Sequence, residues 1–496
     1  MQIKYNRETE YYEAHIFGFP AGINQNDEII RDGQATDAQN IFLDGNKRGG
    51  SAKVNSTTLG ASAILGVAPF YVVGSASKWL LAAHDTKVYR WTGTAFSSIK
   101  TGLTTAKEME FQAFNKKIYM VNGQDGYFEY DGTTYQAVPA YSPTADEIAA
   151  VGANVLDAAY TDVTKNWQII ALLDTFLFLA GNSTHPSTAF FTYIDPTVAT
   201  GSIKPGYLPG LYYVDFRTND NEGLVAAIPY AGDLVFFKES SLFRLLGNSF
   251  STFRPLRIEG AKGTPARRSP AVVGYMLYYL TKDDGVYAFD GNTPMKVLQD
   301  LDPLFQSINQ TYISKACGVE WKGRYWLAVP EGADTTNKTV VVYDPANKGY
   351  TVYRYPFGIT AFTKYKFSDT EVLCAATADG FVYKLETGTD DAGADIDTYV
   401  EWTVGVESAE IKKKPIKALV TCEGGVLDNA TVVCTVDGGT PIAKSLGTGA
   451  ATIPTMYKSD PFGASRGYTF KIKVRHNGTG SFKLTKAKVL FVMAEG

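Results

Sequence analysis

Histidine is scarce in this chain, and its scarcity limits the chemistry that the chain can support. The four histidines are His15, His84, His185 and His476, and none has a second histidine or a cysteine at metal-ligand spacing. This absence argues against a zinc site or a histidine-based hydrolase. The sequence also contains no HExxH motif, no GxxxxGKS/T phosphate loop and no GxSxG elbow. We interpret His84, at the end of an apolar stretch, as a packed or turn histidine.

Clustered cysteines, long apolar runs and excess charge are missing as well. Cys317, Cys374, Cys422 and Cys434 are widely spread, which predicts buried thiols and not a disulfide framework. No run of 18 apolar residues occurs and the N-terminal stretch has no apolar core, so we expect neither a membrane span nor a signal peptide. The net charge of −4 does not indicate binding to nucleic-acid phosphates. We expect a soluble protein made in a reducing cytoplasm.

The chain does contain a hairpin pattern that recurs along its length. In the clearest copy, Met276–Gly291, an apolar strand is followed by Asp284-Gly285, the returning strand Val286–Phe289 and Asp290-Gly291. Asp-Gly pairs favour tight hairpin turns because glycine adopts positive φ without strain. Further copies pair Trp79–His84 with Val88–Gly93, Lys117–Asn122 with Tyr127–Tyr130, Thr175–Gly181 with Ala189–Tyr193, Leu234–Lys238 with Ser241–Gly247, Arg324–Val329 with Thr339–Asp344, and Glu371–Thr377 with Phe381–Leu385.

The spacing of these hairpins favours a β-propeller. The turns at Asp85 and Asp379 lie 294 residues apart, which makes six intervals of about 49 residues each. Units of about 40 to 50 residues with four strands are the propeller period. The 47 glycines and the 13% aromatic content also suit short strands and tight turns. We therefore predict an all-β fold with a propeller of about seven blades. The spacing also allows six or eight blades, and a long β-sandwich with ordinary hairpins is the alternative fold.

The composition divides the chain into three parts. Residues 1–57 are predicted to be an N-terminal arm that closes the ring with Ile41–Leu43, because an unclosed ring leaves an exposed strand edge. Residues 58–390 are predicted to form the propeller. The polar, acidic Thr387–Asp397 indicates the linker out of the ring. Residues 398–496 are predicted to form a small antiparallel β-sandwich.

Two short helices are predicted within the propeller. One is an insert near 143–159, where Thr144 and Glu147 form a capping box and apolar residues recur at helical spacing. An unrecognised blade edge is the alternative for this insert. The other helix begins at Asp302-Pro303, with aspartate as the expected N-cap.

The C-terminal part differs from the ring in its hydrophobic pattern, because its strands alternate strictly between apolar and polar residues. Asp437-Gly438 and Asn477-Gly478 have the composition of hairpin turns. The predicted strands are Lys417–Cys422, Ala430–Val436, Gly467–Val474 and Ser481–Val492.

Acidic and aromatic repeats are the remaining candidates for chemistry. No sialidase-type SxDxGxxW repeat occurs, and turn chemistry explains the repeated aspartates without catalysis. An acidic cluster in the linker offers oxygen ligands suited to calcium but lacks calcium-loop spacing, so a solvated linker is the simpler interpretation. Adjacent aromatic pairs are interpreted as packing between blades. We predict no catalytic, cofactor-binding or metal-binding residue. The residues concerned are Asp85, Asp125, Asp131, Asp284, Asp290 and Asp379 in turns, Asp390, Asp391, Asp395 and Asp397 in the linker, and the pairs Tyr278-Tyr279, Phe236-Phe237 and Phe190-Phe191.

The order of these pieces resembles the β-propeller tail-hub proteins of bacteriophages, also called nozzle or packaged-DNA-stabilising proteins. The resemblance covers most of the chain and is most specific in two blocks of the ring. The segments that carry it are Phe17–Asn24, Ala38–Ile41, Lys47–Gly49, Leu224–Gly247, Gly274–Gly291, Thr389–Gly393 and Gly467–Val492.

The resemblance implies a non-enzymatic virion protein of the phage tail. Six copies would form a ring below the portal and adaptor, contact other virion proteins such as tail fibres, and extend the DNA channel without sequence-specific binding. Gly181–Thr188 and Glu331–Lys338 are the longest loops and hence the candidate gates. Two other functions stay open: a tail-associated propeller that binds a host receptor or glycan, and a polysaccharide-cleaving propeller enzyme.

Overall fold

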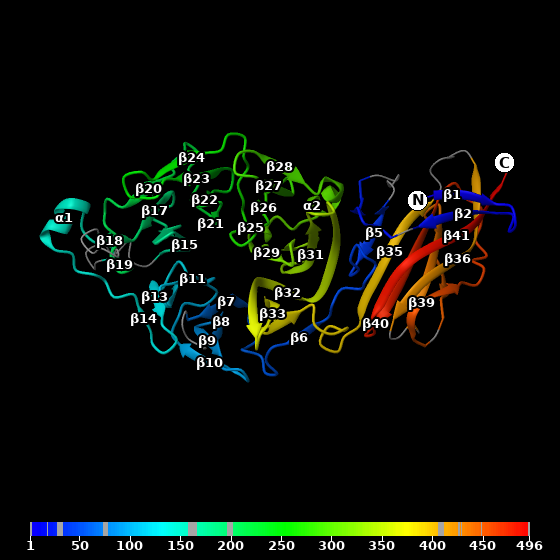
Figure 1. Cartoon of the computed structure of the whole chain (residues 1–496), viewed down its shortest axis with the longest axis horizontal. Coiled ribbons are helices and arrows are strands. Elements are labelled where there is room, and N and C mark those ends of the chain that lie inside the picture. The colour runs from blue at the N-terminus through cyan, green and yellow to red at the C-terminus, as the bar shows by residue number, and fades with distance from the viewer. Residues whose placement is uncertain are drawn as a thin grey trace.

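The computed structural model describes residues 2–16, 18–26, 33–72, 78–156, 166–195, 202–404, 411–424, 427, 429–447 and 449–494. Figure 1 shows a ring of small sheets on the left and two larger sheets on the right, near which both chain termini lie. Helix in the described residues is confined to α1 (Ala145–Val151), α2 (Asp302–Gln306) and two 3-10 turns, η1 (Gln299–Leu301) and η2 (Ile313–Lys315). The fold is therefore all-β.

Five four-stranded sheets follow one another along the ring, and in each sheet neighbouring strands are antiparallel. Their strands are β7 (Ile64–Tyr71), β8 (Lys78–His84), β9 (Lys87–Trp91) and β10 (Phe96–Lys100); β11 (Glu110–Phe114), β12 (Lys117–Val121), β13 (Tyr127–Tyr130) and β14 (Tyr135–Ala137); β15 (Ile169–Leu173), β16 (Phe176–Ala180), β17 (Thr188–Phe191) and β20 (Tyr213–Asp215); β21 (Ala226–Tyr230), β22 (Asp233–Phe237), β23 (Leu242–Leu246) and β24 (Arg254–Arg257); and β25 (Ala271–Val273), β26 (Met276–Leu280), β27 (Val286–Phe289) and β28 (Pro294–Val297). A two-stranded hairpin, β18 (Tyr193–Asp195) with β19 (Ser202–Lys204), projects from the third sheet.

A seven-stranded sheet completes the ring. The first part of its long strand β32 pairs with β31 and the last part pairs with β33, so that one strand serves two groups of strands. The last group ends on β6, which comes from the N-terminal part of the chain and pairs with β34. In spatial order the strands are β29 (Cys317–Trp321), β30 (Arg324–Val329), β31 (Asn337–Asp344), β32 (Gly349–Phe367), β33 (Thr370–Thr377), β34 (Val382–Leu385) and β6 (Ser51–Lys53).

The first strands of the sheets surround a common centre (Figure 1). β7 contacts β11, β11 contacts β15, β15 contacts β21 and β25 contacts β29, and β32 lies against β7. At this last contact Thr360 donates a hydrogen bond to the Ile64 carbonyl (2.7 Å), and Tyr71 stacks on Tyr365 with ring centroids 6.1 Å apart. The arrangement is that of a β-propeller-like fold.

The predicted hairpins are confirmed as the two middle strands of each group. They are apolar on both faces because each sheet packs between two neighbours. All five residues of β26 are buried, and its adjacent tyrosines point to opposite sides: Tyr278 stacks on Tyr325 (5.4 Å) and Tyr279 packs on Phe237 (5.0 Å). The interpretation of the aromatic pairs as packing between sheets is thus confirmed.

The C-terminal part forms two five-stranded sheets. The first is β1 (Gln2–Asn6), β2 (Tyr11–Ile16), β41 (Phe482–Ala494), β36 (Lys412–Gly424) and β39 (Ala451–Lys458), in spatial order. The second is β38 (Ile442–Ser445), β37 (Ala430–Val436), β40 (Phe470–Gly478), β35 (Ile396–Val404) and β5 (Asp37–Gln39). The two sheets share one buried core, in which Phe470 of β40 meets Phe491 of β41 edge to face at 5.5 Å.

The N-terminal segment differs from its prediction. Ile41–Leu43 is not the strand that closes the ring, because the chain turns sharply there: the Phe42 amide donates to the Asn46 carbonyl (2.7 Å). The closing strand is β6. We also did not predict that β1, β2 and β5 join the C-terminal sheets. The short strands β3 (Gly22–Ile23) and β4 (Gln34–Ala35) pair with each other.

The two predicted helices are present. Thr144 caps α1, and both hydrogen bonds of its capping box with Glu147 are formed. α2 begins as predicted, but Asp302 is its first residue and not its N-cap, because Leu301 precedes it in the cap position. One predicted turn is wrong: Asn477-Gly478 pairs with β35 as the end of β40, so the reversal comes after it.

Candidate functional site

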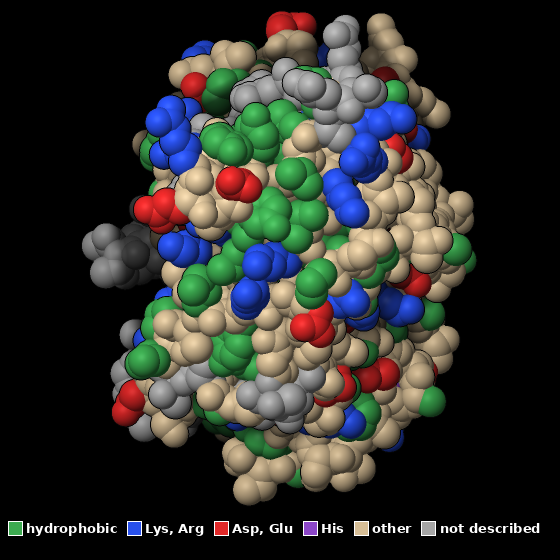
Figure 2. All heavy atoms as spheres, turned by 90° about the vertical axis from the view of Figure 1, so that its right-hand side faces the viewer, with side chains coloured by type: hydrophobic (Ala, Val, Ile, Leu, Met, Phe, Trp, Pro, Cys, Tyr) green, Lys and Arg blue, Asp and Glu red, His purple; other side chains and the backbone are tan. Residues whose placement is uncertain are grey.

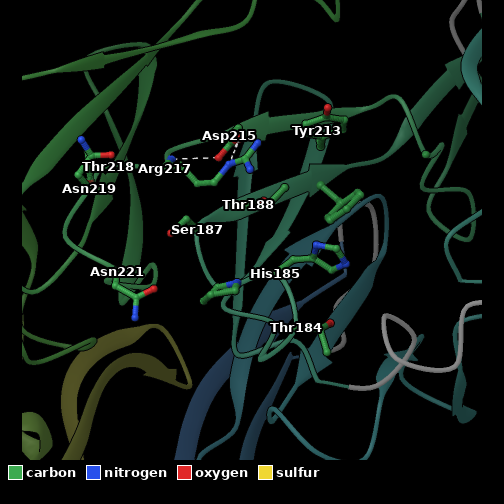
Figure 3. A pocket seen from close by; sticks show the side chains of 13 residues that line it. Thr184, His185, Ser187, Thr188, Tyr213, Asp215, Arg217, Thr218, Asn219 and Asn221 are labelled. Carbon is green, nitrogen blue, oxygen red and sulfur yellow. Dashed lines mark hydrogen bonds and ion pairs between the residues drawn. The ribbon is translucent and has the colours of Figure 1, made fainter.

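A cavity of about 620 Å³ opens at the rim of the ring, beside β17 and β20 (Figure 3). One wall is the predicted gate loop Gly181–Thr188. Backbone hydrogen bonds hold this loop to the segment that follows β20: the Phe216 amide donates to the Ser187 carbonyl (2.9 Å), and the Leu224 amide donates to the Pro186 carbonyl (2.7 Å). The wall is therefore fixed to two neighbouring sheets.

Aromatic rings form the floor and one side of this rim pocket. Phe190 is buried, with Trp167 behind it at 5.6 Å, and His185 meets it edge to face at 5.8 Å. Tyr213 lies 5.9 Å from Phe190 and leaves 47% of its surface exposed. An exposed ring on a rigid base suits contact with a flat, weakly polar ligand.

The polar side of the pocket carries one carboxylate. Asp215 accepts hydrogen bonds from the Arg217 amide (2.9 Å) and from the Arg217 guanidinium, whose side chain is 81% exposed. Thr184, Asn219 and Asn221 add hydroxyl and amide groups at the entrance (Figure 3). Hydrolysis by the two-carboxylate route needs an acid and a partner carboxylate, and this lining supplies a single one.

Two adjacent arginines, Arg267 and Arg268, lie at the axis of the ring, where they line a cavity of about 210 Å³. Arg268 donates hydrogen bonds to the carbonyls of Leu65 (2.9 Å) and Met109 (3.0 Å), which belong to the first and second sheets. Arg267 donates to the carbonyls of Gln168 (3.1 Å) and Val225 (3.2 Å), at the third and fourth sheets. These side chains tie the inner ends of the sheets together.

Electrostatics keep the Arg268 guanidinium charged at this position. Burial alone would lower the pKa of Arg268, but the nearby carboxylates of Glu110 and Glu108 outweigh it and raise the pKa above its usual value. Arg268 Nε lies 3.0 Å from Glu110 Oε1. Arg267-Arg268 was not predicted as a site from the sequence, where the signal is a pair of arginines two residues before the apolar strand β25.

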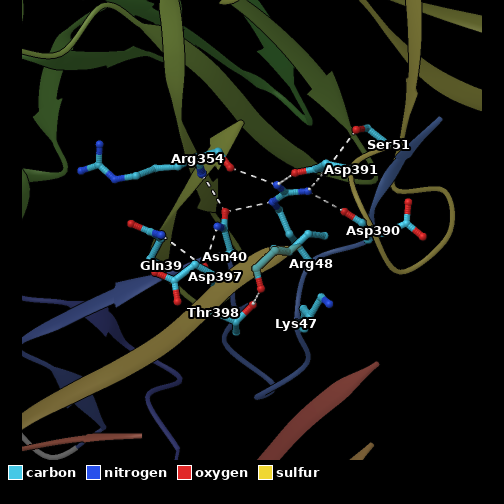
Figure 4. Close-up of polar contacts among 12 residues, drawn as sticks. Gln39, Asn40, Lys47, Arg48, Ser51, Arg354, Asp390, Asp391, Asp397 and Thr398 are labelled. Carbon is cyan, nitrogen blue, oxygen red and sulfur yellow. Dashed lines mark hydrogen bonds and ion pairs between the residues drawn. The ribbon is translucent and has the colours of Figure 1, made fainter. Parts of the chain in front are cut away.

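A second polar site joins the ring to the C-terminal sheets (Figure 4). The fully buried Arg48 forms a two-pronged ion pair with the buried Asp391. Arg48 also donates to the Asn40 side chain and to the Arg354 carbonyl (each 2.9 Å), and its guanidinium lies over the Tyr355 ring at 4.1 Å. This junction brings together the N-terminal segment, the long strand β32 and the linker.

Lys47 extends the junction to the C-terminal sheets. Its ammonium donates to the carbonyls of Gly478 (2.7 Å) and Gly480 (2.6 Å). Burial lowers the pKa of Lys47 to about 8, and the charge of Arg48 adds to this effect. Asp391 also accepts from Ser51 Oγ of β6 (2.8 Å), so the closing strand and the junction are one structure.

The remaining candidates are structural. The solvated-linker interpretation is wrong for Asp391, which is buried, because it neutralises Arg48. No group of three or more potential metal ligands occurs in the described residues. His84 is buried against Ser62, as predicted, and the turn aspartates accept local hydrogen bonds, as Asp290 does from the Thr293 amide (2.8 Å). The four cysteines are free and buried, as predicted.

The second predicted gate loop, Glu331–Lys338, joins β30 to β31. It is tied down at both ends: Glu331 pairs with Arg354, and the Asn337 side chain donates to the carbonyls of Lys315 (2.6 Å) and Ile359 (2.7 Å). The rim pocket and this loop belong to different sheets, so the structure does not bring the two predicted gates into one site.

Comparison with known proteins adds little beyond the fold. No family model and no curated protein matches the chain. Among solved structures, the chain is similar to one in the crystal structure of BBS1N in complex with ARL6DN, soaked with mercury (12% identity, 70% of this chain, 99% of that chain, TM-score 0.41). It is likewise similar to the computationally designed Ika8 protein (11% identity, 67% of this chain, 98% of that chain, TM-score 0.40). None of the helices in the described ranges is long and apolar enough to cross a membrane.

Proposed function

We propose that the ring is a seven-bladed propeller and that the C-terminal sheets form a β-sandwich. Five four-stranded sheets supply five blades. The seven-stranded sheet supplies two more, because β32 is the outer strand of one group and the inner strand of the next. Closure by β6 removes the open edge that an incomplete last blade would expose. Residues 58–390 would then be the propeller and 398–496 most of the sandwich, with strands from 1–57 completing both.

We propose that the chain is a structural protein of a bacteriophage tail. Copies of it, six in the family that the sequence resembles, would form a nozzle or hub ring in the virion, assembled after synthesis in the host cytoplasm. The ring would continue the DNA channel below the portal and adaptor, retain the DNA without reading its sequence and release it at ejection. Tail fibres would be further partners.

The observation that carries this proposal is the junction at Arg48. A hub transmits force between its neighbours, so its two bodies must not swing independently. Domains within one chain move relative to each other by default unless the contact between them is extensive. Here a buried ion pair, the closing strand and the sheets of the C-terminal body share the same residues. The hydrogen bonds of Arg267 and Arg268 to the inner ends of four sheets further support a scaffold.

The rim pocket favours a second candidate function, the binding of a host glycan. Its exposed Tyr213 can lie flat against a sugar ring, and Asp215, Arg217 and the amides can bond to hydroxyls. A glycan array tests this candidate. Tyr213→Ala should abolish any binding, whereas Tyr275→Ala, at another exposed tyrosine of the ring, should not.

Electron microscopy of the purified protein, alone and mixed with candidate portal, adaptor and fibre proteins, tests the hub proposal. Rings with a central hole of about the width of duplex DNA, roughly 20 Å across the phosphates, are expected. Isolated propellers in every mixture, together with a positive glycan array, would reverse the order of the two candidates.

A further inference from the structure

The outer face of the sheet β1-β2-β41-β36-β39 is basic and partly apolar (Figure 2). β41 carries Lys483, Lys486 and Lys488 and no Asp or Glu, and Lys483 pairs with Glu423 of the neighbouring β36 (3.3 Å). The register places Lys458 of β39 next to Leu419 of β36, and Lys488 of β41 on the other side of Leu419. Figure 2 shows lysine and arginine side chains scattered among apolar ones on this face, together with a smaller number of acidic side chains.

Several of these lysines lack a compensating charge. Lys488 pairs with Glu13 (2.7 Å), but Lys417, Lys458 and Lys486 have no carboxylate partner in the described part of the chain. Lys417 lies close enough to Lys458 that, in addition to burial, the like charge lowers the pKa of Lys417. Like charges placed side by side destabilise a sheet, so an anionic group bound over them would relieve a cost that the free protein bears.

An exposed apolar side chain lies among the lysines. Met456 of β39 is 62% exposed, and the register places it beside Thr421, on the same face as Leu419 and Lys458. Apolar side chains gain little from a phosphate backbone, which is bound by positive charges and hydrogen-bond donors. A surface of lysines and large apolar residues therefore suits a protein that presents both acidic and apolar groups.

The opposite end of the chain's long axis has the complementary character. Residues 131–151 contain the acids Asp131, Asp146 and Glu147 and no Lys or Arg, and Glu147 pairs with Lys204 (3.0 Å). Within this stretch α1 exposes Asp146 and Ile148, the latter by 43%. Leu211, 53% exposed, is joined to the end of α1 through its amide, which donates to the Val151 carbonyl (3.1 Å). Figure 1 places α1 at the far left and the basic sheet at the far right.

We propose that this basic sheet face docks on the α1 edge of a second copy of the chain. The contact joins different surfaces of two identical copies, and such head-to-tail contacts close into rings when the rotation permits. The inference rests on the proposed function and names the interface that a hub ring would use.

The size of the sheet is adequate for such a contact. Five strands about 4.8 Å apart and roughly nine residues of about 3.4 Å each span roughly 24 by 30 Å. That is about 700 Å², close to the ~800 Å² that each partner buries in a standard interface. In a closed ring each copy uses both its basic sheet face and its α1 edge. Closure therefore makes the whole ring more stable than a single contact of this modest size would be.

Two charge-reversed variants test the interface. The sheet variant carries Lys458→Glu and Lys486→Glu, and the edge variant carries Asp146→Lys and Leu211→Lys; all four side chains are exposed, so folding should be unchanged in circular dichroism. Assembly is measured by mass photometry over a series of protein concentrations. Each variant on its own should need at least about tenfold more protein to assemble than the wild type. An equimolar mixture should assemble again. Half of its contacts join the two unaltered faces, and the other half join the two altered faces, whose charges are again opposite.

A matched control for the sheet variant carries Lys87→Glu and Lys107→Glu, two exposed ring lysines whose replacement changes the net charge by the same amount as in the sheet variant. It should assemble like the wild type. Rings that persist in both variants would overturn this interface and leave the hub proposal standing. Assembly that responds as expected but yields open chains would retain the interface and argue against the hub. A monomeric wild type that binds a 30-base-pair duplex through Lys458 and Lys486 would replace the second copy with nucleic acid and overturn the proposal.

Discussion

Arg48→Ala is the most informative single perturbation of this chain. It leaves Asp391, whose side chain is 3% exposed, with Ser51 Oγ as its remaining side-chain donor. Removing one partner of a buried ion pair costs about 3 to 5 kcal/mol, because the other charge stays buried and unpaired. The guanidinium also gives up its contact with Tyr355 and its hydrogen bonds to Asn40 and to backbone carbonyls. We therefore expect the junction to open far more often than in the wild type.

Hydrogen exchange measured by mass spectrometry reads this opening locally. The Gly50 amide donates to the Gly388 carbonyl (3.0 Å), and the Ser51 amide donates to the Asp390 carbonyl (2.9 Å). At 1.4 kcal/mol for each factor of ten, a loss of 3 to 5 kcal/mol predicts exchange faster by roughly 150- to 4,000-fold at these amides. Amides of β26, inside the ring, should keep the wild-type rate because they open only with the whole ring.

A matched control and a double variant separate the charge from the packing. Arg217→Ala removes another Arg–Asp pair, but one with an 81% exposed arginine, and should change local exchange by less than about fivefold. Arg48→Ala combined with Asp391→Ala removes both buried charges and should be less damaging than the sum of the single changes. Additive effects, or an Arg48→Ala variant that exchanges like the wild type, would refute the account of the junction as a buried ion pair.

Three further predictions follow from other contacts. Arg268→Ala should lower the stability of the ring by about 3 kcal/mol in urea unfolding, because inner-strand carbonyls lose their donor, and should leave C-terminal exchange unchanged. The pKa of Lys47 is lowered to about 8, so the charged form of Lys47 is disfavoured in the folded protein. The stability of the protein should therefore rise between about pH 8 and 10. In thermal melts, Lys47→Met should flatten this rise. Burial would raise the pKa of Glu13, but hydrogen bonds from Lys488, Asn6 and His15 lower it to about 2. The stability that the ionised Glu13 contributes should therefore be lost as pH falls from about 4.5 towards 2. In hydrogen-exchange measurements, Glu13→Gln should abolish this acid sensitivity of β1 and β2.

The hairpins of the ring could be predicted because their chemistry is local. Gly285 and Gly291 adopt φ of 76° and 100° at the two turns of one copy, and Gly380 adopts 78° at the same place in another. Two buried faces then require apolar side chains on both sides of the intervening strands, which makes them easy to recognise. The capping box of α1 is local for the same reason.

The junction and the N-terminal strands could not be predicted because their partners are distant. Arg48 and Asp391 are 343 positions apart, and nothing near either residue indicates the other. β2 does alternate, with Glu13 and His15 on one face and the buried Ala14 and Ile16 on the other, but this local pattern does not indicate that β2 pairs with β41. Thr387–Asp397 has the composition of a linker, yet it buries one of its aspartates, because composition does not show which acid meets an arginine.

The N-terminal segment makes the long-range contacts that local sequence patterns do not reveal. Within its first 53 residues the chain supplies β1 and β2 to one C-terminal sheet, β5 to the other and β6 to the last strands of the ring. Arg48 lies between β5 and β6, where it binds both the linker and the long strand β32. The ring and the C-terminal sheets therefore depend on the same short stretch, and loss of its order would leave open edges in both. A protein that only displayed a binding pocket would need no such coupling, whereas a rigid piece of a larger assembly would.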